Sequence, residues 1–484
     1  MHYVSHQLTA AVEPDHRATE VQVGRSAREE GYAMTDLVDQ PVRVRGISRS
    51  KAPEPALSDT AIRGDRYWSL EFARLEQDAL WPRVWQVAGR SDQIPTPGDY
   101  ITYEIGRDSV IAVRGEDGVI RVFFNVCQHR GNRLVTAEVG SLIGGEFQCA
   151  YHGWRFGSDG QLKWVPDEGD FVQGSPCGVR NLIEMPSDTW AGFIWFNMDP
   201  SAAPLRDWLD PVAEHLDVYE MENMKRTHWV SVEGDFNWKC VQDNFNESYH
   251  LPYVHPQTLA SMNEHHSGCQ FDLYESGHAR MLMPGGGPGP QYRGKPDRTL
   301  KSLDADLTFW DVDPAPYLND LSGLRVALQR AKRELGLSKG YDFSRYSDEQ
   351  LTDNYHYTVF PNTSFSMKPD GCIWLRATPH PSDPQKCMFD MWYLTRFPEG
   401  ATEYYSNSMK EWVSIDHQVE HQLGVAGEVS CGPGIDQDVA IWNTQQQGLR
   451  SRGFRGGYMP WQERRIQFFH DNIDRHLARG PLHV

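Results

Sequence analysis

The sequence predicts an α+β protein with two folded parts, a small all-β domain and a larger domain in which strands alternate with helices. Three observations predict this class. Short strand-like runs cut by Gly and Asp turns fill residues 85–199, and longer helical patterns alternate with strands from about residue 206 onward. The 484-residue chain has room for two or three domains. No run of about 18 apolar residues occurs, so no membrane-spanning helix is expected.

The N-terminal part is expected to be an arm followed by a helical lead-in. Residues 1–60 are polar and lack apolar periodicity, which is typical of an arm without its own core. Residues 61–84 contain apolar positions at helical spacing from about Ser69 until Pro82 ends the pattern. These positions are Phe72, Leu75, Ala79 and Leu80. We expect this lead-in to pack on the larger domain.

The two domains are expected at residues 85–205 and 206–484. In the larger domain, GCIWLRATPHP and CMFDMWYLTRF predict neighbouring strands, and residues 401–423 predict a long helix. The stretch PGGGPGPQYRGKP is too rich in Gly and Pro for a helix or sheet interior, and a helical pattern, LNDLSGLRVALQRAKRELG, follows it. Residues 284–345 are therefore expected to be an insertion, either a cover over the active site or a plain surface loop.

Charge and cysteine usage exclude some classes of partner. The formal net charge of −19 argues against nucleic acids and anionic membranes, which attract basic surfaces. The start, MHYVSHQLTA, does not have the pattern of a secretory signal. Eight cysteines in a chain of this length indicate a reducing cytoplasm rather than a disulfide framework. Six of them stand alone and are expected in the core: Cys177, Cys240, Cys269, Cys372, Cys387 and Cys431.

Two short segments of the β domain each offer one thiol and one imidazole to a metal. Cys127 precedes His129, and after nineteen further residues Cys149 precedes His152. Zinc fingers usually pair cysteine with cysteine and histidine with histidine. Mixed pairs suit a 2Fe–2S cluster in which two thiolates hold one iron and two imidazoles the other; a structural zinc site is the alternative. The flanking glycines expected to adopt unusual backbone angles are Gly131, Gly153 and Gly157.

The larger domain offers a second group of ligands in NWKCVQDNFNESYHLPYVHP. His250 and His255 would diverge by about 140° on a straight helix, but Pro252 and Pro256 prevent one, so a kink could let the rings converge. Two histidines and a carboxylate would form a facial triad that holds Fe(II) and leaves positions open for dioxygen and substrate.

The residues alone leave the carboxylate of this triad open. Glu247 lies on the His250 side of the segment and could serve locally, with Asp243 one turn before it. The competing choices are Asp436 and Asp438, far downstream in GIDQDVAIWNTQQQGLRSRGF.

Both groups of ligands resemble those of Rieske non-haem iron oxygenase α subunits, the aromatic ring-hydroxylating family. CQHRGNRL and CAYHGWRF are similar to the two cluster-binding loops, and the resemblance covers about residues 60–484. It implies that the 2Fe–2S ligands are Cys127, His129, Cys149 and His152.

The iron-binding segment and the downstream helix of this family resemble the two segments of the larger domain. The resemblance implies that His250, His255 and Asp438 hold the mononuclear iron. Glu247 takes the place of a carboxylate that bridges an iron-ligand histidine to a cluster histidine of the adjacent subunit, and Asp243 is a further candidate catalytic residue. The short form NFNESYH, with Glu at the bridge, looks more like the choline-, betaine- and carnitine-type monooxygenases.

The resemblance also implies an architecture and partners. The expected architecture is a Rieske domain beside a helix-grip catalytic domain of the START/SRPBCC type, with a central antiparallel sheet. We expect a homotrimer or a multiple of trimers, with or without a small β subunit. NAD(P)H would act only through a separate reductase, with or without a ferredoxin, because no flavin or nicotinamide fingerprint occurs in the sequence.

Three hypotheses for function follow. The main one is a terminal oxygenase that uses dioxygen to dihydroxylate, monooxygenate or demethylate an aromatic or related hydrophobic small molecule, as in aromatic hydrocarbon catabolism. The second is a monooxygenase of a quaternary ammonium compound. The third is an electron-transfer iron–sulfur protein. The aromatic residues of YHYTVFPNTSFSM (355–367) and around Trp374 suit a flat substrate, a cation–π cage or ordinary core packing equally well.

Two further histidine pairs are interpreted as solvated positions rather than ligands. His417 and His421 would lie four residues apart on the predicted helix over 401–423, beside Asp416 and Glu420. No third converging group follows them in the sequence. His265 and His266 are treated in the same way.

Overall fold

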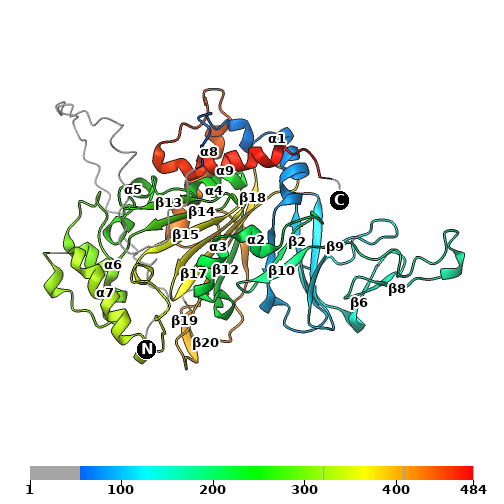
Figure 1. Ribbon diagram of the computed structural model, residues 1–484, viewed down its shortest axis with the longest axis horizontal. Coiled ribbons are helices and arrows are strands. Elements are labelled where there is room, and N and C mark those ends of the chain that lie inside the picture. The colour runs from blue at the N-terminus through cyan, green and yellow to red at the C-terminus, as the bar shows by residue number, and fades with distance from the viewer. Residues whose placement is uncertain (1–54, 320, 407–408, 483–484) are drawn as a thin grey trace.

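The computed structural model describes residues 55–319, 321–406 and 409–482. Nearly all of the predicted N-terminal arm lies outside these ranges. Within them, a large sheet flanked by helices forms the centre, and the all-β part extends from it to one end of the molecule (Figure 1). The predicted α+β class is confirmed. No helix in the described ranges is both long and apolar enough to cross a bilayer.

The β part consists of three antiparallel sheets. A five-stranded sheet has the order β5-β2-β3-β4-β9, and two three-stranded sheets have the orders β6-β7-β8 and β1-β11-β10. Their bounds are β1 Gln86–Arg90, β2 Asp99–Ile105, β3 Asp108–Arg114, β4 Ile120–Phe124, β5 Val139–Ser141, β6 Glu146–Gln148, β7 Arg155–Gly157, β8 Leu162–Trp164, β9 Glu184–Met185, β10 Ser187–Trp190 and β11 Phe193–Phe196. Buried Ile111, Phe123 and Phe147 fill the space between the first two sheets.

The larger domain is built on an eight-stranded sheet of order β13-β14-β15-β16-β17-β18-β12-β21. All its neighbours are antiparallel except β12 and β21. The bounds are β12 Lys225–Gly234, β13 Gln270–Leu273, β14 Ala279–Met283, β15 Asn354–Val359, β16 Thr363–Lys368, β17 Gly371–Pro379, β18 Cys387–Thr395 and β21 Gln422–Val425. The predicted neighbours GCIWLRATPHP and CMFDMWYLTRF are β17 and β18, so that expectation is confirmed.

Helices cover both faces of this sheet. Helices α4, α8 and α9 pack on one face, where Val241, Trp442 and Ile466 meet Leu375 and Phe389. Helices α2, α3, α6 and α7 join the opposite core, together with strand β11 of the β part. The bounds are α2 Leu205–Leu209, α3 Val212–Leu216, α4 Trp238–Phe245, α6 Pro296–Phe309, α7 Leu321–Leu335, α8 Pro433–Leu449 and α9 Arg464–Leu477. The sheet therefore separates two cores, and only one of them contains α4 and α8.

A helix begins where the sequence predicts one, after Ser69, but its end is irregular. Helix α1 (Leu70–Leu75) begins after Ser69, whose side chain accepts a hydrogen bond from the Phe72 backbone N–H. It passes into a π-helical turn (Glu76–Leu80) and a 3₁₀ turn that contains Pro82. This change of helical pitch turns Glu76 into the interior.

Residues 284–345 lie between two strands that pair directly, β14 and β15. They contain α6 and α7, and the second of these matches the predicted helix. The segment thus leaves the sheet and returns to it. Leu303, Leu324 and Leu328 anchor it in the second core, so it is a packed helical excursion rather than a loose loop.

The expectation of a long helix over residues 401–423 is wrong. Strands β19 (Glu403–Ser406) and β20 (Glu411–Ser414) pair as a hairpin, and β21 begins at Gln422. Tyr, Trp and Val occupy the middle of EYYS and EWVS, and such residues favour a pleated surface. Charged residues recur every few positions in this stretch and resemble the polar face of an amphipathic helix, although the apolar residues stand in adjacent pairs rather than at helical spacing.

Candidate metal centres

The two predicted cluster loops have the same backbone construction. In each loop the cysteine N–H bonds to a carbonyl five residues later, from Cys127 to Asn132 and from Cys149 to Trp154. In each, a glycine N–H bonds back to the cysteine carbonyl, and Gly131 and Gly153 have φ values of 74° and 71°. The expectation for Gly157 is wrong, because the positive φ in that turn falls on Gly160. Two equivalent turns thus present four side chains to one place.

The four side chains suit an iron–sulfur cluster. The Nδ1 atoms of His129 and His152 lie 3.1 Å apart, as two nitrogens aimed at one ion would. The thiols of Cys127 and Cys149 are buried and face each other. Burial raises the pKa of Cys127 to about 11, so its thiolate requires a cation beside it. Paired thiols and paired imidazoles fit the mixed donor set of a Rieske cluster.

Aromatic side chains pack against the two imidazoles of the cluster loops. The Trp154 ring stacks on His129 at 4.6 Å and 9°, and Tyr151 lies 3.8 Å from His152. Tyr151 is half exposed, and the Arg130 guanidinium lies 5.2 Å from the centre of its ring. The histidine side of the loops therefore faces the molecular surface, whereas the thiols are inside.

In the second centre the chain bends as the prolines predict. Helix α4 ends at Phe245, and α5 (Leu251–Val254) is a separate short helix with Pro252 in its first turn. His250 precedes α5 and His255 follows it. Their rings lie 5.2 Å apart at 76°. His255 leaves helical geometry at the end of α5, with φ −123° and ψ 52°, so the two rings meet although a straight helix would separate them.

Asp438, on α8, completes this group. Its Oδ1 lies 2.7 Å from Nε2 of His255 and 3.7 Å from Nε2 of His250. One ligand atom from each of the three residues lies within 4.8 Å of the others. Asp436 instead bonds to Ser430 and to the Cys431 N–H. Two imidazole nitrogens and one carboxylate oxygen form the donor set of a facial triad.

Each imidazole of the triad is held by its other nitrogen. Nδ1 of His250 lies 2.5 Å from Glu247 Oε1, and Nδ1 of His255 lies 2.8 Å from Gln437 Oε1. Burial disfavours a charged His250, but the Glu247 and Asp438 carboxylates outweigh it and raise its pKa above the ordinary value. These contacts leave both Nε2 atoms for a metal and fix the ring planes.

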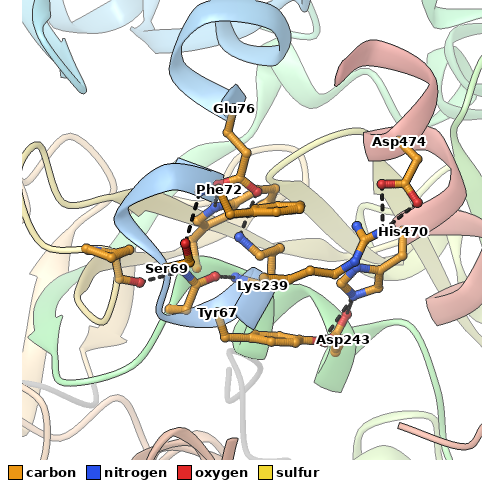
Figure 2. A network of polar contacts seen from close by, with 12 residues as sticks. Tyr67, Ser69, Phe72, Glu76, Lys239, Asp243, His470 and Asp474 are labelled. Atoms are coloured by element: carbon orange, nitrogen blue, oxygen red, sulfur yellow. Dashed lines mark hydrogen bonds and ion pairs between the residues drawn. The ribbon is translucent and has the colours of Figure 1, made fainter. Parts of the chain in front are cut away.

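Asp243 does not face the triad. Its carboxylate accepts a hydrogen bond from the Tyr67 hydroxyl at 2.5 Å and lies 3.1 Å from Nε2 of His470. Figure 2 shows these three side chains meeting where α4 approaches the lead-in and α9. All three are buried. The contacts favour a role in positioning α4, and the catalytic role expected for Asp243 stays a prediction.

A buried ion pair beside this network ties the lead-in to α4. Lys239 Nζ lies 2.7 Å from Glu76 Oε1, and both side chains are almost completely buried (Figure 2). Phe72 lies 5.3 Å from the same ammonium group. The lead-in therefore fixes the helix that carries the iron segment.

We expect Lys239→Met to destabilise the fold by about 3 kcal/mol, because it leaves the buried Glu76 carboxylate without its cationic partner. Urea unfolding followed by circular dichroism measures this loss. The matched control is Asp159→Asn, which breaks the exposed pair with Lys163 and is expected to cost under about 1 kcal/mol. Equal losses in the two variants would contradict the structural role of the buried pair.

The two further histidine pairs of the sequence, His417 with His421 and His265 with His266, do not contribute to either metal centre. His421 stacks on Trp229 at 4.0 Å and bonds to Ser231, and His265 bonds to Ser267. The aromatic residue Trp374 packs on Phe193 and Trp392 in the core on the far face of the sheet from α4. These residues serve packing and local hydrogen bonding.

Comparison with known proteins agrees with both centres. Residues 221–479 match the family model "Ring hydroxylating alpha subunit (catalytic domain)", and residues 84–180 match the "Rieske [2Fe-2S] domain". The chain therefore belongs to the ring-hydroxylating oxygenase α subunits. It is an oxidoreductase whose cofactors are one Rieske 2Fe–2S cluster and one mononuclear iron. The hypothesis of a pure electron-transfer protein is accordingly wrong.

Its relatives include two kinds of oxygenase. The large oxygenase component of the naphthalene 1,2-dioxygenase system of Pseudomonas putida is 32% identical, over 80% of this chain and 88% of the relative. The glycine betaine monooxygenase oxygenase subunit of Chromohalobacter salexigens is 32% identical, over 48% of this chain and 51% of the length of that relative. A solved structure of naphthalene 1,2-dioxygenase with indole has a TM-score of 0.60 at 21% identity, covering 87% and 93% of the two chains.

Proposed function

We propose that His250, His255 and Asp438 are the ligands of the mononuclear iron, and that Cys127, His129, Cys149 and His152 are those of the cluster. The observation that carries the first assignment is the convergence of two Nε2 atoms and one carboxylate oxygen from α5 and α8. The bound iron would supply the reductive activation of dioxygen. The protein would orient the rings and exclude water.

We propose further that the cluster of one subunit delivers electrons to the mononuclear iron of the next subunit in a head-to-tail trimer. In Figure 1 the hairpins β6–β8 project from one end of the molecule, whereas α5 lies on the other side of the large sheet. Exposed aromatic side chains mark both places: Tyr151 at the cluster, and Tyr249 and Tyr253 beside the iron segment. Aromatic surface of this kind is enriched at subunit contacts.

Glu247 is the proposed link between the centres. One of its carboxylate oxygens holds His250, and the other accepts hydrogen bonds from the N–H groups of Tyr249 and His250. This fixed carboxylate stands beside the exposed Tyr249, where a partner's cluster histidine would approach. An NAD(P)H-dependent reductase, with or without a ferredoxin, would supply electrons in the cytoplasm. A small β subunit is compatible with this arrangement.

The substrate class that these observations support best is an aromatic or related hydrophobic compound. The naphthalene dioxygenase component matches four-fifths of the chain, and the betaine monooxygenase about half. Oxidation of a quaternary ammonium compound is the second candidate, favoured by Glu at position 247.

Oxygen uptake with a surrogate reductase tests the proposed function. Protein purified anaerobically is expected to contain three irons per chain and to consume dioxygen when an aromatic substrate is added. Sedimentation is expected to give three times the 55.3 kDa chain mass, or a multiple of that. Two irons per chain would overturn the triad assignment, and a fully active monomer would overturn the trimer.

A further inference from the structure

Four polar side chains form a compact patch on the sheet face that meets α4. His356 pairs directly across the sheet with Ser366, and Thr358 with Ser364. Directly paired residues point to the same face, and residues two apart on one strand do so as well. The Phe245 ring of α4 stacks on His356 at 6.0 Å and 23°. The patch therefore faces the helix that leads to the metal centre.

A hydrogen-bond chain fixes the orientation of one amide over this patch. Arg465 Nη2 donates to Thr358 Oγ1 at 2.7 Å, and the Thr358 hydroxyl donates to Asn246 Oδ1 at 2.8 Å. The amide NH2 group of Asn246 is therefore left as a donor. Nδ2 of Asn246 is buried and has no hydrogen-bond partner in the part of the chain that the structure describes.

Two further polar atoms of the patch are buried without a partner among the described residues, Nε2 of His356 and Oγ of Ser364. Burial, followed by the charge of Arg465, lowers the pKa of His356 well below its ordinary value, so the ring is neutral. Nδ1 of His356 lies 2.8 Å from Oγ of Ser366. In the tautomer in which the serine hydroxyl donates to Nδ1, the single proton of the neutral ring lies on Nε2. Unsatisfied buried donors are costly and rare in native proteins, so three in one patch point to a ligand.

The charge beside this patch is positive. Arg465 is completely buried, and no carboxylate in the described ranges forms an ion pair with it. The carboxylate of Asp272 forms an ion pair with Arg280, with 2.9 Å between Oδ2 and Nη2. Burial lowers the pKa of Arg465 to about 9, which leaves it cationic at neutral pH. The carboxylates of Asp272 and Glu247 offset part of this charge, and a buried guanidinium without an ion-pair partner among the described residues favours an electron-rich or anionic neighbour.

Two contacts connect the patch to the elements that carry the metal centre. Asn246 immediately precedes Glu247, and the Phe245 ring is 5.8 Å from Trp442, one helical turn after Asp438 on α8. A substrate at the triad that extends toward the sheet would therefore meet these donors.

We propose that Asn246, His356 and Ser364 bind an acceptor oxygen of the substrate, and that the substrate is an aromatic carboxylate. This proposal rests on the proposed function and narrows its substrate class. The three donors would satisfy the carboxylate oxygens, and Arg465 would balance the charge through Thr358. A quaternary ammonium group has no acceptor atom and would face three donors and a cation, so the patch disfavours that alternative.

Calorimetric titration of the anaerobic holoenzyme tests this proposal with two matched series. Benzoate and 2-naphthoate are compared with toluene and 2-methylnaphthalene, and phenyltrimethylammonium is the cationic probe. We expect at least one of the acids to bind more than tenfold tighter than its methyl counterpart and than the cation. His356→Phe and Ser364→Ala are expected to remove most of that preference. The control is Trp392→Phe, at a buried residue on the opposite face whose Nε1 has no hydrogen-bond partner among the described residues; it is expected to preserve the preference.

Several outcomes would overturn the proposal. One is equal or tighter binding of the methyl compounds or the cation, which would mean that the patch holds ordered water only. Another is an acid preference that survives both substitutions in variants with native circular dichroism and iron content. Oxygen uptake with an uncharged aromatic substrate in the same preparations separates the two claims. If that oxidation persists, the proposed function stands and only the acid-binding role is lost.

Discussion

Asp438→Ala is expected to lose the mononuclear iron and to keep the visible spectrum of the Rieske cluster. The substitution removes the carboxylate oxygen that lies 2.7 Å from Nε2 of His255 and 3.7 Å from Nε2 of His250. Loss of a group that merely orients a metal ligand already costs roughly 10- to 100-fold. Product formation should therefore fall at least about 100-fold, as measured by substrate-dependent oxygen uptake together with iron analysis.

Asp436→Asn is the matched control for this variant. Asp436 lies two residues away on the same helix, but it bonds to Ser430 and the Cys431 N–H rather than to the histidines. We expect it to retain three irons per chain. If Asp436→Asn lost iron and Asp438→Ala retained all of it, the iron ligand would be Asp436 rather than Asp438.

Glu247→Gln is expected to keep both metals but to uncouple the two centres. The amide can still contact His250 Nδ1, yet it carries no charge to stabilise the imidazole or a partner's cluster histidine. Loss of a charged hydrogen bond behind a metal ligand suggests a fall of roughly 10- to 100-fold in turnover. In a single turnover of reduced enzyme, cluster oxidation should slow and product per oxidised cluster should drop.

The control for Glu247→Gln is Glu264→Gln. Glu264 is another buried residue of the same region, and its carboxylate has no hydrogen-bond partner among the described residues; only its backbone carbonyl, which the substitution keeps, accepts a hydrogen bond from the Ser248 hydroxyl. Its substitution is expected to leave single-turnover kinetics unchanged. Full activity in Glu247→Gln would remove the bridging role.

The sequence allowed the ligands to be predicted because their constraints are local. Each cluster loop needs its cysteine, histidine and glycine within a few residues, and one backbone turn satisfies them all. The prolines around His250 and His255 likewise predict the bend that lets the two rings converge. Asp438 could be chosen only by resemblance, since 183 residues separate it from His255.

Contacts between distant segments could not be predicted in this way. His470 reaches Asp243 across 227 residues, and no local pattern identifies that pairing. In the sequence, nothing distinguishes Gln437 from other polar residues of a helix. Its contact with His255 exists because α8 packs beside α5. The strands over residues 401–423 were mistaken for a helix because charged residues recur through them every few positions and their apolar residues do not alternate, so the usual pattern of a strand is missing.

Mixed oligomers give the most direct test of transfer between subunits. One parent is Asp438→Ala, which keeps the cluster and loses the iron. The other is Cys149→Ser, which loses the cluster and keeps the iron. Neither parent alone should oxidise substrate. When the two chains are expressed together, trimers should regain activity, because an intact cluster then faces an intact iron of the neighbouring subunit. Mixed trimers as inactive as their parents, with both metals present, would contradict the account.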